Sequence, residues 1–366
     1  MKEKNKITFA LDIGTRTVIG LILKKQDKGY EILDSEVIEH DKRAMLDGQI
    51  HNVYEVSKIV KEIKNRLEKR IDYDLKKVSI AAAGRALETV TTEYKVDFEK
   101  KRYIEDSDVK NLEYAAIQKA QKSLAQSDPD NSASAYHFVG YSVIEYLLDG
   151  MFLQDLIGQK GSKISVKLIT TFLPQVVIDS LLSVIHRANL EVEHLTLEPI
   201  AAANMVIPKE MYNFNLALVD IGAGTSDVAI TKGGSMIGYA MVPVAGDEIT
   251  ESLAEEYMLE YNSAEKVKKN LSEKDFFKAK NILGSEIKID SAKALSVINP
   301  QVKNMVKMIS EKIIEINQKA PQAVMCIGGG SLTPDLKEEL IKKLELSSER
   351  VGIRDGSNLE NIDGYI

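Results

Sequence analysis

One short pattern occurs twice in this chain, at positions 208 residues apart. In Leu11–Thr15 (LDIGT) and again in Val219–Thr225 (VDIGAGT), an Asp-Ile-Gly segment ends one apolar run and precedes another. Each copy continues as a strand, a polar turn, a strand and then a helix with apolar spacing, at 53–67 and at 249–257. Repeats of about 200 residues are too long for a solenoid. The sequence therefore predicts two similar lobes whose equivalent hairpins face each other across a cleft.

The composition is that of an ordinary globular protein with more than one domain. The 366 residues are 44% hydrophobic and 28% charged, and no apolar run approaches the roughly 18 to 20 residues that span a bilayer. The N-terminal residues lack a secretory hydrophobic region, so we expect a cytoplasmic protein. A net charge of -7 without a basic block argues against nucleic acid as a partner. Because Cys326 is the single cysteine, we expect neither an intramolecular disulfide nor a zinc site.

The first half of the chain alternates strands and helices. Strands are predicted at 7–13, 18–23, 30–38 and 77–83 with a helix at 53–67, and the first three strands are expected to form an antiparallel meander. From residue 88 the pattern changes, because strands at 88–98, 136–147 and 163–172 accompany one helix at 109–124. We interpret this stretch as a small inserted α+β subdomain, with an exposed loop at 126–134. Elements predicted at 176–188, 192–197, 199–205 and 216–221 then lead into the second half.

The two Asp-Ile-Gly hairpins carry residues suited to a magnesium nucleotide. Glycine at a tight turn lets backbone N–H groups approach a ligand and form a nest for phosphate. Thr15 and Thr225 can add hydroxyl donors, whereas Asp12 and Asp220 would repel a bare phosphate unless a divalent cation lay between them. The alternative is that Asp-Ile-Gly is an ordinary β-turn, which a single copy would favour. Two copies in equivalent places favour the nucleotide site.

A third glycine cluster, Gly328–Ser331, follows the apolar run 323–327. We expect a helix after it, with Thr333 as its N-cap and Pro334 in its first turn. A glycine cluster of this kind can form the back wall of a nucleotide site. Neither the Walker pattern GxxxxGK[ST] nor the dinucleotide pattern GxGxxG occurs in the sequence, which disfavours P-loop and Rossmann sites.

These three segments resemble the signatures of the actin-like ATPase superfamily. Asp12–Thr17 resembles its first phosphate loop, Asp220–Asp227 its second, and Gly328–Ser331 its adenosine loop. Within that superfamily the chain resembles the bacterial cell-division family FtsA. Segments similar to those of FtsA are Tyr146–Gly150, Ile157–Gly161 and Ile164–Ile169 in the inserted subdomain, and Pro243–Thr250 and Ser263–Lys268 near the adenine side.

The resemblance implies an α/β protein with the actin-like two-lobe fold, that is, duplicated ribonuclease-H-like domains with a small α+β FtsA-type inserted subdomain. The first actin-like lobe is expected at 1–83 and 174–215, and the inserted subdomain at 84–173. The second lobe is expected at 216–262 and 300–366, with a short adenine-side subdomain at 263–299.

The resemblance also implies ATP and Mg²⁺ as cofactors. Asp12 and Asp220 are expected to hold Mg²⁺ through water and, with Glu198, to form the catalytic set. The expected cofactor contacts are Gly14, Thr15, Arg16, Thr17, Gly222, Ala223, Gly224, Thr225, Gly246, Glu265, Lys266, Lys269, Gly328, Gly329, Gly330 and Ser331.

Four of these residues have a second interpretation. Glu198 either places an attacking water or is a helix N-terminal acid stabilised by the macrodipole. Arg16 stands where the family usually has a small residue, and it either contacts phosphate or faces solvent. Glu265 and Lys266 resemble ribose and adenine contacts, although exposed ion-pairing residues would have the same appearance.

The function implied by the resemblance is a cytoplasmic, self-assembling scaffold of bacterial cell division with weak or no ATPase activity. Its expected partners are itself, as a polymer or dimer, and the FtsZ C-terminal peptide or another division or pilus protein. Membrane contact, at the inner face of the cell membrane, is expected through a C-terminal segment beyond Ile366. Two alternatives remain. One is the related PilM class, a platform of type IV pilus assembly that binds a partner peptide, and the other is a sugar or acetate kinase, which requires an additional carboxylate base.

Overall fold

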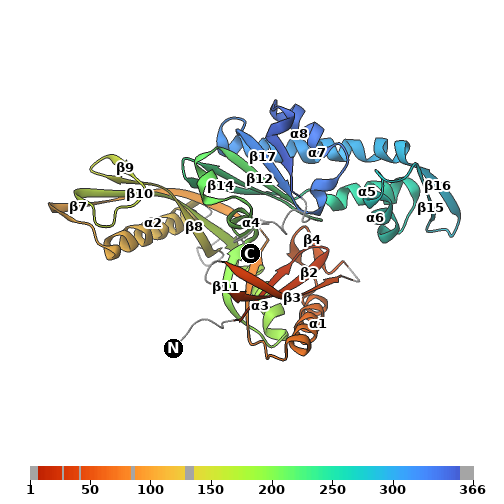
Figure 1. Cartoon of the computed structure of the whole chain (residues 1–366), viewed down its shortest axis with the longest axis horizontal. Helices are drawn as coiled ribbons and strands as arrows, with labels where there is room; N and C mark the ends of the chain where they lie inside the picture. Colours follow the sequence, from red (N-terminus) through yellow and green to blue (C-terminus); the bar gives the residue numbers. More distant parts are fainter. Residues whose placement is uncertain (1–6, 27–28, 41–42, 84–86, 128–135, 355–366) are drawn as a thin grey trace.

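The computed structural model describes residues 7–26, 29–40, 43–83, 87–127 and 136–354. Within these ranges the chain is an α/β protein with two five-stranded sheets, one four-stranded sheet and two short hairpins. Each of two lobes contains one five-stranded sheet, and a narrow arm projects from one side of the molecule (Figure 1). None of the helices in the described ranges is long and apolar enough to cross a membrane.

The first lobe is built on a sheet with the strand order β11-β6-β1-β2-β3. Its strands are β1 (Ile7–Ile13), β2 (Thr17–Lys25), β3 (Tyr30–Glu39), β6 (Lys77–Ala82) and β11 (Glu191–Leu197). β1, β2 and β3 form the predicted antiparallel meander, and β6 pairs in parallel with both β1 and β11. The helices α1 (Val53–Ile71) and α3 (Gln175–Arg187) share a hydrophobic core with this sheet.

The second lobe repeats this topology. Its sheet has the order β18-β17-β12-β13-β14, formed by β12 (Leu216–Ile221), β13 (Ser226–Lys232), β14 (Ser235–Val242), β17 (Ala323–Ile327) and β18 (Val351–Ile353). As in the first lobe, three antiparallel strands come first and two parallel strands follow. The predicted duplication is therefore confirmed, since the equivalent strands occupy equivalent positions in the two sheets.

The helix α1 shows why the apolar spacing predicted these elements correctly. Its buried residues recur every three or four positions, so they line one face of the helix against the sheet. The side chain of Asn52 caps the helix by accepting a hydrogen bond from the Glu55 N–H at 3.1 Å. The helix ends at Asp72, which adopts a left-handed conformation.

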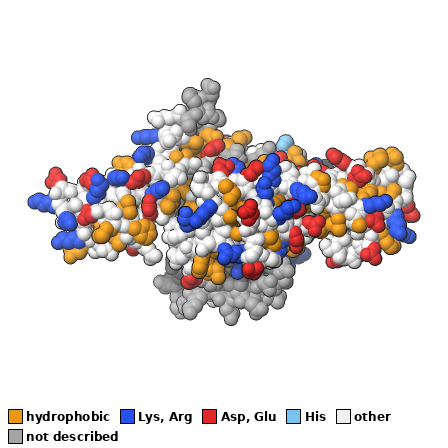
Figure 2. Space-filling view, turned by 90° about the horizontal axis from the view of Figure 1, so that it is seen from above, with side chains coloured by type: hydrophobic (Ala, Val, Ile, Leu, Met, Phe, Trp, Pro, Cys, Tyr) orange, Lys and Arg blue, Asp and Glu red, His pale blue; other side chains and the backbone are white. Residues whose placement is uncertain are grey.

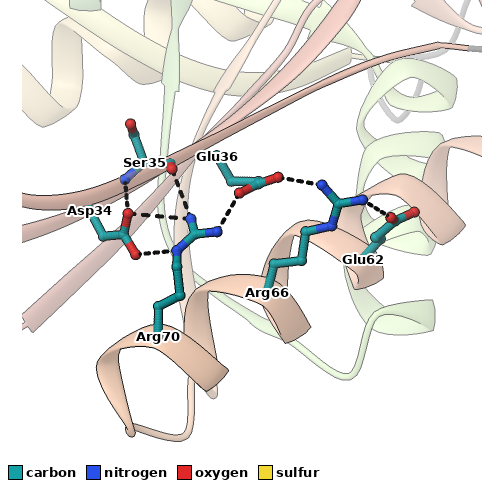
Figure 3. Close-up of polar contacts among 6 residues, drawn as sticks. All are labelled: Asp34, Ser35, Glu36, Glu62, Arg66 and Arg70. Atoms are coloured by element: carbon teal, nitrogen blue, oxygen red, sulfur yellow. Dashed lines mark hydrogen bonds and ion pairs between the residues drawn. The ribbon is translucent and has the colours of Figure 1, made fainter.

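An ion-pair network joins the exposed edge strand β3 to α1 (Figure 3). Arg70 contacts Glu36 at 2.6 Å and Asp34 at 2.7 Å, while Arg66 bridges Glu36 and Glu62. The guanidinium of Arg70 holds the pKa of Asp34 and of Glu36 below the usual range. Charged side chains along an edge strand disfavour its pairing with another chain.

The arm is inserted into the first lobe between β6 and α3. Its sheet has the order β7-β10-β8-β9, formed by β7 (Glu88–Tyr103), β8 (Tyr136–Leu148), β9 (Met151–Leu153) and β10 (Lys160–Pro174). The helix α2 (Asp106–Ser127) covers this sheet and contributes to a separate small core. Three of these strands and the helix were predicted for the stretch, and the short strand β9 was not. Of the predicted loop at 126–134, the first two residues end α2 and the remainder lies outside the described residues.

The arm contacts the second lobe as well as the first. The β8 strand lies against the edge strand β14, where the hydroxyl groups of Ser142 and Tyr239 are 2.9 Å apart. Tyr239 is 3% exposed and belongs to a core cluster under α4 (Glu198–Val206), the helix that leads from the first lobe into the second. The inserted arm therefore packs where the two lobes meet.

The remaining elements of the second lobe lie between β14 and β17. They are α5 (Gly246–Tyr257), α6 (Tyr261–Lys269), the hairpin of β15 (Phe276–Lys280) and β16 (Glu286–Asp290), and α7 (Ser291–Asn317). This hairpin forms the end of the molecule opposite the arm (Figure 1). Among the described residues on the face shown in Figure 2, side chains of both charge signs are interspersed with hydrophobic ones.

One predicted cap is wrong. Residues Gly329–Leu332 form a 3-10 turn in which the Thr333 N–H donates to Gly330 O at 3.1 Å, so the backbone of Thr333 closes this turn. The helix α8 (Leu336–Leu344) begins only after it, and its N-cap is Asp335. In a 3-10 turn each N–H bonds to the carbonyl three residues earlier. The backbone of the glycine cluster forms such a turn, so the α-helix starts only after it.

Candidate functional site

A cavity of about 720 Å³ lies between the two lobes. Its walls come from the β1–β2 turn of the first lobe, the β12–β13 turn of the second, the first residues of α4 and α5, the helix α6 and the third glycine cluster. A cavity of this size falls within the range of small-molecule and cofactor sites, about 300–1,000 Å³.

The two Asp-Ile-Gly turns have the same backbone geometry. The Gly14 N–H donates to Thr17 O at 3.0 Å, and the Gly222 N–H donates to Thr225 O at 2.9 Å. A Cβ atom on Gly14 would lie 3.1 Å from Thr17 O, and one on Gly222 would lie 3.3 Å from Thr225 O. Glycine therefore permits the same tight reversal in both lobes.

The two turns touch across the cleft. A Cβ atom on Gly224 would lie 2.9 Å from the Thr15 Oγ1 and 3.0 Å from the Asp47 Cα, so a side chain there would push the lobes apart. The Thr15 hydroxyl accepts a hydrogen bond from the Gly48 N–H at 3.1 Å, which leaves its own proton to donate. Gly224 does not line the cavity, but it permits the close approach of the lobes.

The third glycine cluster packs directly behind the second turn. Gly328 has a φ of +80°, and a Cβ atom there would collide with the Asp220 carboxylate and the Ile221 carbonyl. A Cβ on Gly330 would collide with the Ile221 side chain. Ser331 is 1% exposed, lies outside the lining and donates its hydroxyl to Gly328 O at 2.7 Å. The serine thus stabilises the cluster from within.

Four neighbouring carboxylates line the cavity: Asp12, Glu198, Asp220 and Asp227. Burial and the charge of Asp12 raise the pKa of Asp220 to about 6, and burial and the charge of Asp220 raise the pKa of Asp227 to about 8. Burial and the other three acids raise the pKa of Glu198 well above its usual value. Burial also raises the pKa of Asp12, although that side chain remains open to solvent in the cavity. Within the described part of the chain, no lysine or arginine forms an ion pair with any of the four.

This acidic cluster has the character of a cation site. Like charges held together in a low-dielectric cleft repel one another, and a divalent cation would relieve that repulsion. Asp227 is 4% exposed, and its Oδ1 has no hydrogen-bond partner, which leaves a buried acceptor for a water or a ligand. In the described residues no three His, Cys, Asp or Glu side chains are placed to ligate one ion directly. Oxygen donors of this kind are compatible with Mg²⁺, which keeps several of its waters and binds one or two carboxylates.

Glu198 lies at both of the places that the sequence suggested for it. It is the first residue of α4, and it also lines the cavity beside the three aspartates. The charges of Asp227, Asp12 and Asp220 all act on it. A role confined to stabilising the helix end would not require this location.

On the α6 side of the cavity, Glu265 is 4% exposed and forms several polar contacts. Its Oε2 pairs with the Lys268 Nζ at 2.7 Å and accepts from Thr250, while its Oε1 pairs with Arg16 at 3.1 Å. Lys268 also donates to Gly246 O at 2.8 Å. Lys266, predicted together with Glu265, is exposed and does not line the cavity.

The structure thus brings most of the predicted site residues into one cavity. The predicted residues that line it are Asp12, Gly14, Thr15, Arg16, Thr17, Glu198, Asp220, Gly222, Ala223, Thr225, Gly246, Glu265, Lys269, Gly328, Gly329 and Gly330. Gly224, Lys266 and Ser331 lie outside the lining.

Sequence reasoning missed six polar or turn residues of the lining as individual contacts: Gly48, Asp227, Asp247, Lys268, Ser272 and Thr333. Helical spacing could have found Lys268, because a residue three positions after Glu265 shares its face of α6. Asp227 lies directly opposite Asp220 in the β12–β13 register, which a hairpin alignment could have found. Gly48 lies between the two short strands β4 (Met45–Leu46) and β5 (Gln49–Ile50), and no local signal places it at the cleft.

Comparisons with known proteins agree with this architecture. A family model described as cell division protein FtsA matches residues 217–364. The FtsA protein of Streptococcus pneumoniae serotype 2 is 21% identical over 358 residues, which cover 94% of this chain and 73% of that protein. The FtsA protein of Bacillus subtilis strain 168 is 22% identical over 379 residues, covering 96% of this chain and 81% of that protein.

Two solved structures share the fold. The PilM-PilN type IV pilus biogenesis complex matches with a TM-score of 0.64 at 14% identity, covering 98% of this chain and 95% of that one. The MreB5 protein of Spiroplasma citri, in a crystal structure bound to ADP, matches with a TM-score of 0.56 at 14% identity, covering 97% and 93%. At this level of identity the likeness shows the fold alone, which is the actin-like two-lobe fold.

Proposed function

We propose that this chain, which has the actin-like fold and is similar to the bacterial cell-division protein FtsA over nearly its whole length, binds Mg²⁺-ATP between its lobes and acts as a self-assembling scaffold in cell division. The cytoplasmic location expected from the sequence is part of this proposal. So is the expectation that its partners are further copies of itself and another division protein.

The observation that carries the proposal is the pair of equivalent glycine turns around four facing acids. Backbone N–H groups at glycine turns of this kind can approach phosphate oxygens, and Thr15 retains a hydroxyl proton to donate. Mg²⁺ would supply the positive charge that lets the acids and the phosphates occupy one cleft. Asp12 and Asp220 would hold it through water, with Asp227 completing the polar shell.

Residues of the protein itself would contact the base or ribose and orient the water. Gly328, Gly329 and Gly330 form a wall without side chains, against which a flat base or ribose can pack. Glu198 is the candidate for orienting a water toward the phosphates, since it borders the same cavity as Asp12. We expect this to support weak turnover or none, so that nucleotide state serves mainly to set lobe closure and assembly.

Isothermal titration with ATP, with and without Mg²⁺, tests the binding part of the proposal. Wild type should bind in a Mg²⁺-dependent manner, and Asp12→Asn and Asp220→Asn should each weaken binding and reduce its Mg²⁺ dependence. Asp179→Asn is the matched control, because Asp179 lies exposed on α3 away from the cavity. Unchanged ATP affinity and Mg²⁺ dependence in both cavity variants would refute the proposal.

A second candidate function is a platform for pilus assembly. The observation in its favour is the match to the PilM-PilN complex over nearly the whole length of both chains. Co-purification of the tagged protein in its own cells, with separate probes for division and for pilus proteins, discriminates the two. A fluorescent fusion that gathers at the division site supports the first function, and one that gathers with the pilus machinery supports the second.

A further inference from the structure

Two arginines of the first lobe reach across the cleft to carboxylates of the second lobe. Arg16 pairs with Glu265 of α6 at 3.1 Å. Arg43 pairs with Glu251 of α5, and its guanidinium lies 4.9 Å from the centre of the Tyr261 ring. Both contacts are on the side of the cavity where α5 and α6 form the wall.

Arg16 belongs to the first phosphate turn itself, between Gly14 and Thr17. Its Nη1 is committed to Glu265 and its Nη2 lies 3.6 Å from Glu39 of the same lobe. The side chain of Arg16 is 23% exposed and that of Glu265 is 5% exposed. Arg16 therefore does not simply face solvent, because its guanidinium pairs with a protein carboxylate at the wall of the cavity, and its contact with phosphate stays a prediction.

Glu265 extends this contact to the second phosphate turn. Its other oxygen pairs with Lys268, and Lys268 donates to the carbonyl of Gly246 at 2.8 Å. The Gly246 N–H in turn donates to the carbonyl of Gly222 at 3.2 Å. A continuous series of polar contacts therefore runs from the first turn, through α6 and the start of α5, to the second turn.

Both partners of the cross-cleft pair have a second partner within their own lobe. If the lobes separate, Arg16 keeps Glu39 and Glu265 keeps Lys268, so neither charge is left buried without compensation. Removing one partner of an isolated buried pair is costly, but a pair with such alternatives can open and close at a modest cost. The contact is thus suited to a reversible transition.

We propose that Arg16 is a positioning residue. Its ion pair with Glu265, here called the clasp, holds the two lobes together and so couples closure of the cavity to the alignment of both phosphate turns. This inference rests on the proposed nucleotide site. In the closed state the clasp holds the turns at the spacing that a bound nucleotide needs, and nucleotide binding in turn favours the clasped state, as linkage requires. Arg43 supports the same closure from outside the cavity, because it does not contribute to the cavity lining.

The test combines a distance between the lobes with nucleotide affinity. Spin labels at Asn65→Cys on α1 and Glu256→Cys on α5 report the separation of the lobes by pulsed electron resonance, and we expect Cys326 to stay unlabelled because it is 0% exposed. The variants are Arg16→Ala, Arg16→Lys, Glu265→Gln, the double variant Arg16→Ala/Glu265→Gln, and Arg43→Ala. Arg66→Ala is the control, because it removes an arginine from the surface network of the same lobe.

The expected result is a longer and broader distance in Arg16→Ala and Glu265→Gln, with Mg²⁺-ATP affinity reduced on the order of fivefold to tenfold. The double variant should be no weaker than either single variant, and Arg16→Lys should recover part of both effects. Arg43→Ala should lengthen the distance and weaken affinity by a smaller factor, roughly twofold. Arg66→Ala should change neither.

The outcomes that overturn the clasp are distinct from those that overturn the nucleotide site. If Arg16→Ala weakens binding as much in the Glu265→Gln background as in wild type, Arg16 acts on the nucleotide directly and the clasp is wrong. If wild type binds no nucleotide, the proposed function fails, and the distances without nucleotide still decide the clasp. In that case a lobe separation unchanged by Arg16→Ala would reject it, and a longer one would support it.

Discussion

At the scale of single residues, the main feature of the cavity is a set of negative charges that the fold brings close together. Asp220 and Asp227 lie directly opposite each other on β12 and β13, and Asp12 and Glu198 face them from the first lobe. Opposed like charges in a buried hairpin are unfavourable. This arrangement therefore lowers the stability of the free protein and favours a bound cation.

The stability of the free protein should depend on pH through Asp227. Burial and Asp220 raise the pKa of Asp227 from 3.8 to about 8, so between these pH values the unfolded state releases a proton that the folded state keeps. Stability then falls as pH rises from about 4 to about 8. Asp227→Asn removes this dependence, and its melting temperature should exceed that of wild type by a margin that grows from pH 5 to pH 8.

Differential scanning fluorimetry in a chelator measures this margin, with Asp179→Asn as the surface control. A margin that shrinks toward pH 8 would contradict the predicted direction of the shift. Adding Mg²⁺ and ATP should reverse the order of the two proteins at pH 8, since only wild type retains the carboxylate.

Gly328 and its neighbour Gly329 provide a matched pair for a second test. Gly328→Ala combines a positive φ with a collision against Asp220, whereas a Cβ on Gly329 meets no atom within 4 Å. We expect Gly328→Ala to cost about 1–3 kcal/mol of unfolding free energy and to reduce Mg²⁺-ATP binding. Gly329→Ala should change stability little in the same urea titration. Equal losses in both variants would show that the close packing on Asp220 is not the cause.

At the scale of elements, the arm is attached to one lobe through the chain and to the other through contacts. The β8 strand lies against β14, and Gly140 of β8 faces Ile200 of α4, two residues after Glu198. The Ser142–Tyr239 hydrogen bond lies at this junction. A movement between the lobes must therefore change the packing under β8.

Tyr239→Phe tests how much the hydroxyl contributes to this junction. The variant should lose about 0.5–1.5 kcal/mol of stability, because a buried donor and acceptor pair is removed. Hydrogen exchange should become faster in β8 and β14 while α1 is unaffected. Tyr212→Phe is the control, because the Tyr212 hydroxyl bonds to Asn204 in a more exposed setting. If Ser142→Ala added its full cost on top of Tyr239→Phe, the two hydroxyls would not form a coupled pair.

At the scale of the whole molecule, the two lobes and the nucleotide site are expected to control self-assembly. Mg²⁺-ATP should increase the fraction of wild-type protein that sediments as polymer, because a closed cavity fixes one relative orientation of the lobes for packing between copies. Asp220→Asn should sediment no more with nucleotide than without it. Wild type that binds nucleotide but never sediments would instead favour the peptide-binding platform.

Much of the fold followed from patterns that act over a few residues. Alternating and helical apolar spacing located β1, β2, β3, α1 and the three long strands of the arm, because burial on one face imposes a period on the sequence. The repeated Asp-Ile-Gly segment predicted the two lobes. The cap at Thr333 was predicted wrongly, because a 3-10 turn built on the glycine cluster preceded α8.

The amino-acid sequence by itself determined that two equivalent glycine turns with acids beside them would exist, since tight turns and buried strands depend on nearby residues. The tertiary structure decided which side chains meet. Asp227, Gly48 and Lys268 line the cavity, and Arg16 forms an ion pair with Glu265 instead of facing solvent. These contacts join residues far apart in the chain, so they depend on how the lobes and α6 pack. Burial in that cleft also raises the pKa values of the four acids, a property that no residue has in isolation.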